Sequence, residues 1–274
     1  MVTGATDGIG LAMCYEFARK GMNVLLISRS RQKLDDCAAS IKKKYPETEL
    51  STLVVDFTFF NEKLRQEVAD AIKDLDVGVL VNNVGISYPY TKYFHELDTD
   101  VIQQLLTLNV WSTTFMTKIV LPGMLARKRG AIVNIGSASG VATAPLLSQY
   151  GAAKSYILMF SKAMNVELAG KGIHVQCQVP LYVTTKLAKI RNASLFVCTP
   201  EVYARAAVAC IGYEVDVSPY WSHALQMFVI KSLPDFIMTK LTMLSHLSIR
   251  AAGLKKDKRI SEAALAAESP KKTK

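Results

Sequence analysis

The sequence has few of the residues from which disulfide frameworks and metal centres are built. Its five cysteines are dispersed, none of them in a CxxC pair, and its four histidines are equally scattered. Separated thiols in odd number are typical of free cysteines in a reducing compartment, whereas zinc sites need closely spaced ligands. We therefore expect free thiols and no metal ion.

Long hydrophobic runs are also missing. No segment reaches the roughly 18 uninterrupted apolar residues that a simple membrane-spanning helix requires. The nearest approach, residues 225–247, is interrupted by Lys231, Pro234, Asp235 and Lys240. This pattern fits a helix pair that lies on a membrane surface, and it fits ordinary core packing equally well.

Acidic residues are in the minority, with 23 Asp and Glu against 33 Lys and Arg, which gives a net charge of +10. The basic residues are not interleaved with aromatic ones, so the sequence argues against nucleic acid as a partner. An anionic membrane surface or a phosphate-bearing ligand fits the surplus better. Part of that surplus lies in residues 254–274, which we expect to form a solvated basic tail.

Short aliphatic runs alternate with amphipathic stretches along most of the chain. We expect strands over residues 24–28, 50–56, 77–82, 131–137 and 173–179, and helices over residues 9–20, 31–44, 62–75, 98–125 and 148–170. Strands separated by single helices give right-handed crossovers and a parallel sheet with helices on both faces. The prediction is an α/β fold, a doubly wound Rossmann-type sheet, as one domain over residues 1–253. Residues 220–252 would form a helical, membrane-facing extension of it.

A glycine-rich turn, Thr-Gly-Ala-Thr-Asp-Gly-Ile-Gly, occupies residues 3–10. Gly4 permits a tight turn, Gly8 lets the backbone approach a pyrophosphate, and Gly10 lets the following helix pack closely on the sheet. The start of that helix offers N–H donors and a positive dipole end to phosphates. The turn predicts a dinucleotide site with contacts from Thr3, Gly4, Asp7, Gly8, Ile9 and Gly10.

The end of the second expected strand favours one form of the cofactor. Arg29 stands where an acidic residue would bind the ribose of NAD, and an arginine there pairs with the 2′-phosphate of NADP. A solvated loop arginine is the alternative. Asp56, after the third strand, fits either a contact to the adenine amino group or a cap of the next helix.

A Tyr-x-x-x-Lys spacing places two side chains on one face of a helix, and the chain contains it three times. The pairs are Tyr88/Lys92, Tyr150/Lys154 and Tyr182/Lys186. Only Tyr150 begins a clear helical pattern, and only Tyr150 has a serine, Ser137, thirteen residues upstream at an expected strand end. Ser139 lies close enough to share the role of that serine. We therefore select Ser137, Tyr150 and Lys154 as candidate catalytic residues.

These motifs together resemble the short-chain dehydrogenase/reductase family. The chain has Asn-Asn-Val-Gly at 82–85, where the family usually has Asn-Asn-Ala-Gly, and Pro-Leu at 180–181 in place of the usual Pro-Gly. With Asn109 and the motifs above, the resemblance spans roughly residues 2–190.

The resemblance implies a role for each of these residues. Tyr150 would be the general acid in carbonyl reduction, Lys154 would favour its phenolate form and hold the nicotinamide ribose, and Ser137 would bind the substrate carbonyl. Asn109 would hold a relay water, although a helix-interior asparagine bonded only to backbone is the plainer interpretation. Cofactor contacts implied in the same way are Asn82, Asn83, Gly85, Tyr150, Lys154, Val183 and Thr184.

Three further segments resemble the very-long-chain 3-oxoacyl-CoA reductase type, which is 17β-hydroxysteroid dehydrogenase 12-like. They are residues 85–90, residues 182–188 and the C-terminal lysines Lys271 and Lys272, at the spacing of a dilysine retrieval signal. The resemblance implies NADPH-dependent reduction of long-chain 3-oxoacyl-CoA in fatty-acid elongation, at the endoplasmic reticulum membrane with the catalytic domain facing the cytosol. Its partners would be acyl-CoA, other elongation enzymes, the membrane surface and a second copy of the chain.

An acyl-CoA substrate would need an apolar groove, to which residues 225–247 could contribute. Lys186, Lys189 and Arg191 fit either contacts to its phosphates or a solvated basic loop. A hydroxysteroid dehydrogenase acting on a sterol ketone is the alternative enzyme, because sister enzymes reduce steroids. The short stretch before the glycine turn, Met1 to Thr3, suggests an N-terminally shortened chain. A catalytically impaired form that serves as an interaction partner is therefore the third hypothesis.

Overall fold

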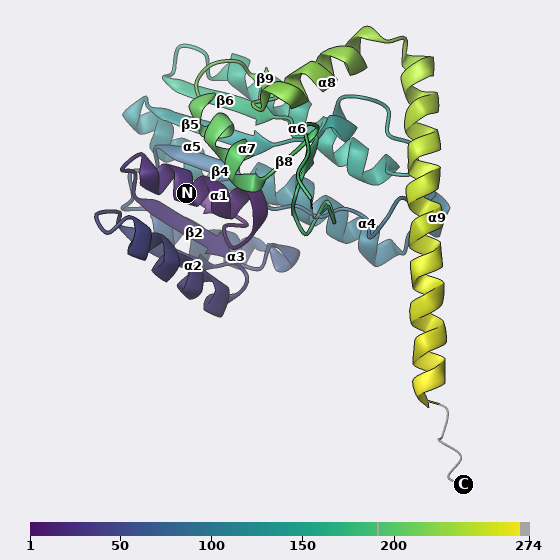
Figure 1. Cartoon of the computed structure of the whole chain (residues 1–274). Coiled ribbons are helices and arrows are strands. Elements are labelled where there is room, and N and C mark those ends of the chain that lie inside the picture. The colour runs from purple at the N-terminus through teal and green to yellow at the C-terminus, as the bar shows by residue number, and fades with distance from the viewer. Residues whose placement is uncertain (191, 269–274) are drawn as a thin grey trace.

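The computed structural model of the protein describes residues 1–190 and 192–268. A parallel sheet of seven strands runs through its centre in the order β3-β2-β1-β4-β5-β6-β9 (Figure 1). The strands are β1 (Val2–Thr3), β2 (Val24–Ser28), β3 (Leu50–Val54), β4 (Val79–Asn82), β5 (Gly130–Ile135), β6 (Ile173–Gln178) and β9 (Asp216–Val217). The Rossmann-type α/β fold expected from the sequence is thereby confirmed.

Helices cover both faces of this sheet. Those on one face are α1 (Gly8–Arg19), α2 (Arg31–Lys44) and α7 (Pro200–Ala209), and those on the other are α3 (Glu62–Ile72), α5 (Ser112–Arg127) and α6 (Ser148–Glu167). Buried side chains such as Leu26 and Ile132 fill the space between sheet and helices. A strand buried on both faces needs apolar side chains in both directions, and the aliphatic runs accordingly predicted β2 to β6, whereas β9 at the edge of the sheet was not expected.

The central strand β1 is short but pairs on both sides. Val2 lies opposite Leu26 of β2 and Val81 of β4, and it is fully buried. Because β1 precedes the glycine-rich turn, this pairing places the turn at the carboxyl edge of the sheet, where ligands of doubly wound folds bind.

The helix expected over residues 98–125 is two helices. Helix α4 (Thr99–Leu106) and helix α5 are joined by one π-helical turn at Thr107–Trp111, which contains Asn109. Hydrophobic periodicity does not reveal the change, because a π-turn adds only one residue to the repeat. Such turns occur frequently at functional sites.

The C-terminal part also differs from the expectation. Helix α8 (Trp221–Ser232) ends before Pro234, and helix α9 (Asp235–Glu268) then runs along the side of the domain and beyond it (Figure 1). The solvated basic tail expected from residue 254 is thus helical as far as Glu268, and its side chains at positions 254–263 are exposed. Alanines of high helix propensity and the Lys258–Glu262 ion pair at 3.9 Å explain why the helix continues.

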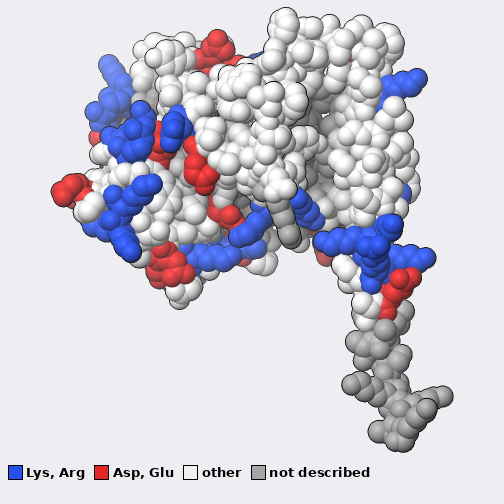
Figure 2. Space-filling view, in the orientation of Figure 1, with Lys and Arg blue, Asp and Glu red and all other residues white. Residues whose placement is uncertain are grey.

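Charge is unevenly distributed over the surface. Figure 2 shows a largely uncharged area over α8 and the upper part of α9, and a basic cluster over the lower part of α9. Among the described residues, no helix combines the length and the hydropathy needed to cross a bilayer.

Candidate active site

The glycine-rich turn joins β1 to α1 with very little space around it. Gly8 has a φ of +53°, and a Cβ on Gly10 would lie 2.4 Å from the carbonyl oxygen of Gly4. Asp7 caps α1 by accepting a hydrogen bond from the N–H of Gly8 at 2.8 Å. Gly4 and Gly8 line a cavity, so the turn presents backbone to that cavity in front of a helix N-terminus, an arrangement that suits a pyrophosphate.

Two candidate catalytic side chains lie on one face of α6. Lys154 is only 6% exposed, and its Nζ lies 5.9 Å from the centre of the Tyr150 ring. The same Nζ donates a hydrogen bond to the carbonyl oxygen of Ile135 at 2.8 Å. Ser137 follows β5 directly, its Oγ accepts from the N–H of Ser139 at 3.2 Å, and its side chain lies beside that of Tyr150. The structure therefore brings Ser137, Tyr150 and Lys154 together.

Burial shifts the pKa values of both α6 side chains. Desolvation lowers the pKa of Lys154 to about 8. Desolvation also raises the pKa of Tyr150, and the neighbouring hydroxyl of Ser137 opposes that rise. At neutral pH Tyr150 is therefore a phenol and Lys154 an ammonium. In these charge states Tyr150 can act as a proton donor, and the neighbouring ammonium of Lys154 favours the phenolate that forms.

Asn109 lies in the π-helical turn and is 1% exposed. Its Nδ2 donates to the carbonyl oxygens of Ile86 and Leu105, both at 3.0 Å, whereas its Oδ1 has no partner. A Cβ on Gly85 would lie 2.5 Å from this Oδ1 and 3.5 Å from Nζ of Lys154. Because Gly85 has no side chain, Oδ1 of Asn109 and Nζ of Lys154 both face the space beside it. Oδ1 of Asn109 is a buried acceptor that lacks a hydrogen-bond donor there.

A cavity of about 890 Å³ joins the glycine-rich turn to the candidate catalytic residues. Most of the residues expected at the site line it, namely Gly4, Asp7, Gly8, Ile9, Arg29, Asp56, Asn83, Gly85, Ser137, Tyr150, Lys154 and Val183. Arg29 lies exposed just beyond β2. Asp56 caps the short helix Phe57–Phe59 by accepting from the N–H of Thr58 at 2.9 Å, which was the alternative to an adenine contact.

Several expected contact residues do not line this cavity. Asn82 is buried, and its Nδ2 donates to Oγ1 of Thr117 at 3.1 Å and to Oδ1 of Asn134 at 2.9 Å. Thr3 is buried as well, and its Oγ1 accepts from the N–H groups of Asn83 and Val84. The side chains of Asn82 and Thr3 therefore hold neighbouring segments of the protein together and do not line the cavity. Gly10 packs inside the turn, and Thr184 lines the neighbouring cleft.

For the end of the cavity away from the glycine-rich turn, the sequence predicted only that residues 225–247 could contribute to an apolar groove. Its wall comes from α8 and α9, through Ile230, Met238, Leu241, Thr242, Ser245, His246 and Ile249. His246 is buried and ties α9 to the domain, because its Nδ1 contacts the carbonyl oxygen of Pro145 at 2.5 Å and its own carbonyl accepts from Thr91. A lone histidine in an apolar stretch was no signal of this anchoring role.

The basic residues expected near the cavity mouth are partly engaged. Lys186 forms an ion pair with Asp7 at 2.5 Å, and Lys189 donates to the carbonyl oxygen of Pro89 at 2.7 Å. Both line the cavity. Arg191, the third member of that expected group, lies outside the described residues.

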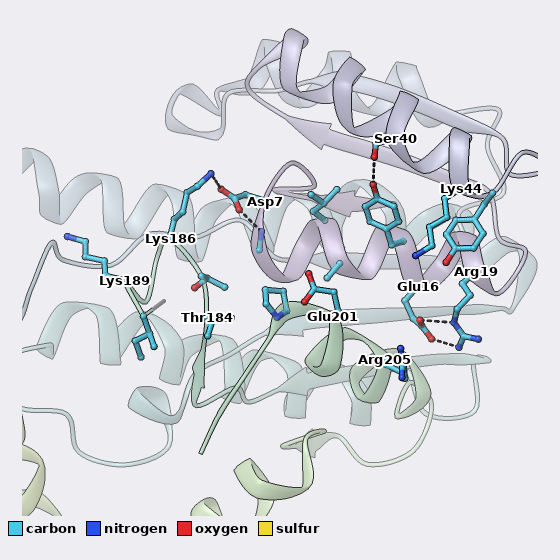
Figure 3. Close-up of a pocket in the computed structure, with 18 of the residues that line it drawn as sticks. Asp7, Glu16, Arg19, Ser40, Lys44, Thr184, Lys186, Lys189, Glu201 and Arg205 are labelled. Atoms are coloured by element: carbon cyan, nitrogen blue, oxygen red, sulfur yellow. Dashed lines mark hydrogen bonds and ion pairs between the residues drawn. The ribbon is translucent and has the colours of Figure 1, made fainter. Parts of the chain in front are cut away.

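A second cleft of about 1370 Å³ lies between α1, α2 and α7 (Figure 3). Its polar contacts include the Arg19–Glu16 ion pair and a 2.6 Å hydrogen bond between the hydroxyl groups of Tyr15 and Ser40. It meets the first cavity at Asp7 and Lys186. None of the three candidate catalytic residues lines it, so we assign the chemistry to the first cavity.

Comparison with known proteins agrees with this geometry. A family model described as short chain dehydrogenase matches residues 1–195. The human very-long-chain 3-oxoacyl-CoA reductase is 42% identical over 261 residues, which are 94% of this chain and 83% of that one. The human inactive hydroxysteroid dehydrogenase-like protein 1 is 39% identical over 258 residues, 93% of this chain and 78% of that one.

Solved structures show the same fold. A short-chain dehydrogenase from Sphingobium yanoikuyae in complex with NADPH superposes with a TM-score of 0.71 at 26% identity, and the match covers 85% of this chain and 95% of that one.

Proposed function

The chain belongs to the short-chain dehydrogenase family of oxidoreductases, and within that family we propose that it reduces the 3-keto group of long-chain or very-long-chain 3-oxoacyl-CoA with NADPH. One observation carries this proposal. A single cavity joins a dinucleotide cradle at one end, the Ser137, Tyr150 and Lys154 group in the middle, and an apolar wall from α9 at the other end. A hydride donor, a ketone and a long acyl chain would each have a place in it.

The residues present fit a nicotinamide dinucleotide. The turn before α1 is too tight for side chains at Gly4 and Gly10, and the backbone of Gly4 and Gly8 lines the cavity in front of the helix N-terminus, which suits a pyrophosphate. Arg29 at the tip of β2 is placed for the 2′-phosphate that distinguishes NADP from NAD. When bound, the reduced cofactor supplies the hydride that the ketone carbon receives.

Tyr150 would supply the proton. Its raised pKa keeps it protonated at neutral pH, and a developing alkoxide is basic enough to take that proton. Ser137 would donate a hydrogen bond to the ketone oxygen and stabilise the negative charge that develops there. The ammonium of Lys154 would stabilise the phenolate that remains, because a cation favours the charged form of a neighbouring acid.

A water relay would return the proton to Tyr150, because Lys154 would give a proton to the phenolate and take one from a water held by Asn109. The unpartnered Oδ1 of Asn109 and the Nζ of Lys154 face one point beside Gly85. A water there accepts from the ammonium and donates to the amide oxygen, which satisfies both buried groups. The π-helical turn would serve to aim the Asn109 side chain at this point.

The decisive experiment measures NADPH oxidation by the purified full chain with a long-chain 3-oxoacyl-CoA and, separately, with a steroid ketone. We expect turnover with the acyl-CoA, and we expect Tyr150→Phe to abolish it while the variant still binds NADPH. Turnover of the steroid alone would establish the alternative hydroxysteroid dehydrogenase.

The third hypothesis, a catalytically impaired interaction partner, draws on the likeness to the human relative whose name calls it inactive. NADPH binding without turnover of either substrate would establish it. The intact Ser137, Tyr150 and Lys154 group favours catalysis.

The setting of the reaction is part of the proposal. We place the protein at the endoplasmic reticulum membrane, with the catalytic domain in the cytosol, other elongation enzymes beside it and a second copy of the chain as a further partner. The dilysine spacing that suggested this compartment lies at Lys271 and Lys272, outside the described residues. Fluorescence microscopy of a tagged full chain, with both lysines changed to serine as the comparison, tests the location.

A further inference from the structure

Helices α8 and α9 expose an unusual number of large apolar side chains. On α8, Trp221, Leu225 and Phe228 follow one another at helical spacing, and Phe228 is 69% exposed. On α9, large apolar side chains are exposed on one helical face at positions 236, 244, 247 and 254, and Phe236 is 74% exposed. We refer to these seven residues as the outer stripe. An exposed apolar surface of this kind is typical of a site that contacts a membrane or another protein.

The opposite side of α9 faces the catalytic cavity. Met238, Leu241 and Ile249 line that cavity, and in a helix their positions lie roughly opposite Phe236 and Leu247. Helix α9 therefore separates the two surfaces: one of its faces lines the catalytic cavity, and the opposite face carries the α9 residues of the outer stripe. Leu241 and Ile249 are themselves partly exposed, which places them at the mouth of the cavity.

Positive charge accompanies this apolar surface. Residues 221–262 contain seven Lys and Arg against three Asp and Glu, a surplus of four. Figure 2 shows the uncharged area over α8 and upper α9 and the basic cluster directly below it. Apolar side chains next to a cluster of lysines and arginines match an anionic bilayer surface, where acyl chains lie beneath negative headgroups.

We propose that the outer stripe docks α8 and α9 in the plane of an anionic phospholipid bilayer and that the acyl chain enters the cavity past Leu241 and Ile249. The second part rests on the proposed acyl-CoA reductase function. In this arrangement the acyl chain passes from the lipid into the cavity without crossing water, while the charged CoA end of the substrate remains in water. No spanning helix is required for this arrangement, since an interfacial helix buries only its apolar face.

Vesicle binding tests the docking. The full chain is sedimented with vesicles of phosphatidylcholine containing about 30% phosphatidylserine, and with vesicles of phosphatidylcholine alone. We expect the wild type to bind the anionic vesicles. For the double variant Phe228→Ser/Phe236→Ser we expect the partition coefficient to fall at least tenfold, because each change removes a phenylalanine side chain that would be buried in the lipid. The matched control is Phe59→Ser/Val166→Ser, which changes side chains that are 71% and 75% exposed elsewhere.

Equal binding of the two double variants would overturn the proposal. The proposal would also be overturned if the wild-type chain bound neither kind of vesicle and instead formed a dimer through the outer stripe, as detected by light scattering. Circular dichroism of both variants establishes that they are folded.

Activity separates this proposal from the proposed function. The stripe variant should reduce a short, water-soluble 3-oxoacyl-CoA at the wild-type rate, but lose at least tenfold in rate on a long-chain substrate presented in vesicles. Vesicle binding without reduction of any acyl-CoA refutes the function and leaves the docking standing. Reduction of the short substrate without vesicle binding refutes the docking alone.

Discussion

Replacing Lys154 by methionine should make the protein more stable and at the same time inactive. The difference between the ordinary pKa of 10.5 and the value of about 8 corresponds to about 3 kcal/mol of desolvation cost for the buried ammonium. Methionine removes this charge, and it also removes the hydrogen bond to Ile135, which is worth about 1 kcal/mol. The net expectation at pH 7 is a gain of about 2 kcal/mol, or about 4–8 °C in Tm.

The pH dependence of this gain follows from the same shift. Below pH 8 the lysine is charged in both the folded and the unfolded chain, so the desolvation cost is fully present. Between pH 8 and 10.5 the unfolded chain binds a proton that the folded chain has released, so the stability of the wild type rises with pH. The advantage of Lys154→Met should therefore shrink across that window.

Thermal unfolding by calorimetry at pH 7 and pH 9.5 measures the effect, and NADPH oxidation by the same samples should fall by at least a hundredfold. Lys162→Met is the matched control on the same helix. Lys162 is half exposed and paired with Asp216 at 3.1 Å, so its loss should change stability by less than about 1 kcal/mol. A Lys154→Met protein less stable than the wild type at pH 7 would refute the reasoning, because Lys154 would then not carry an uncompensated buried charge.

Three further predictions concern the cavity and the glycine-rich turn. Gly85→Ala places a Cβ 2.5 Å from Oδ1 of Asn109, so the turnover rate should fall by about a hundredfold while the melting temperature stays within a few degrees. Gly10→Ala should cost about 1–3 kcal/mol in urea unfolding, because its Cβ meets backbone at 2.4 Å, whereas Gly78→Ala, with open space around it, should be neutral. Arg29→Ala should lower the preference for NADPH over NADH by at least tenfold in kcat/KM, and an unchanged preference would exclude a phosphate contact.

Local patterns in the sequence predicted the sheet and named most of the residues that we assign to the candidate site. A strand buried on both faces must be apolar throughout, and a turn that approaches phosphate must be glycine, so these features are visible without a structure. Tyr150 and Lys154 were selected by their spacing, because helical periodicity fixes which residues share a face, and Ser137 by its place at an expected strand end.

Features that depend on tertiary hydrogen bonds were not visible in the sequence. Asn82 was expected at the cofactor, but its amide is used between β4, β5 and α5. The π-helical turn at Asn109 and the wall formed by α9 depend likewise on contacts between distant segments.

The placing of the candidate catalytic group is best understood from the polar bonds beneath it. Helix α6 is fastened to β5 at two points, by Asn134 donating to Oγ of Ser161 at 2.9 Å and by Lys154 donating to the carbonyl oxygen of Ile135. Ser137 follows the end of that same strand, so the two bonds fix its distance from Tyr150.

Acid–base chemistry depends on such distances to within a fraction of an ångström. A buried amide bonded on both sides resists sliding better than apolar packing, because any displacement leaves it unsatisfied. The polar bonds in this core therefore hold the reacting side chains in register, which apolar side chains of the same volume would not do.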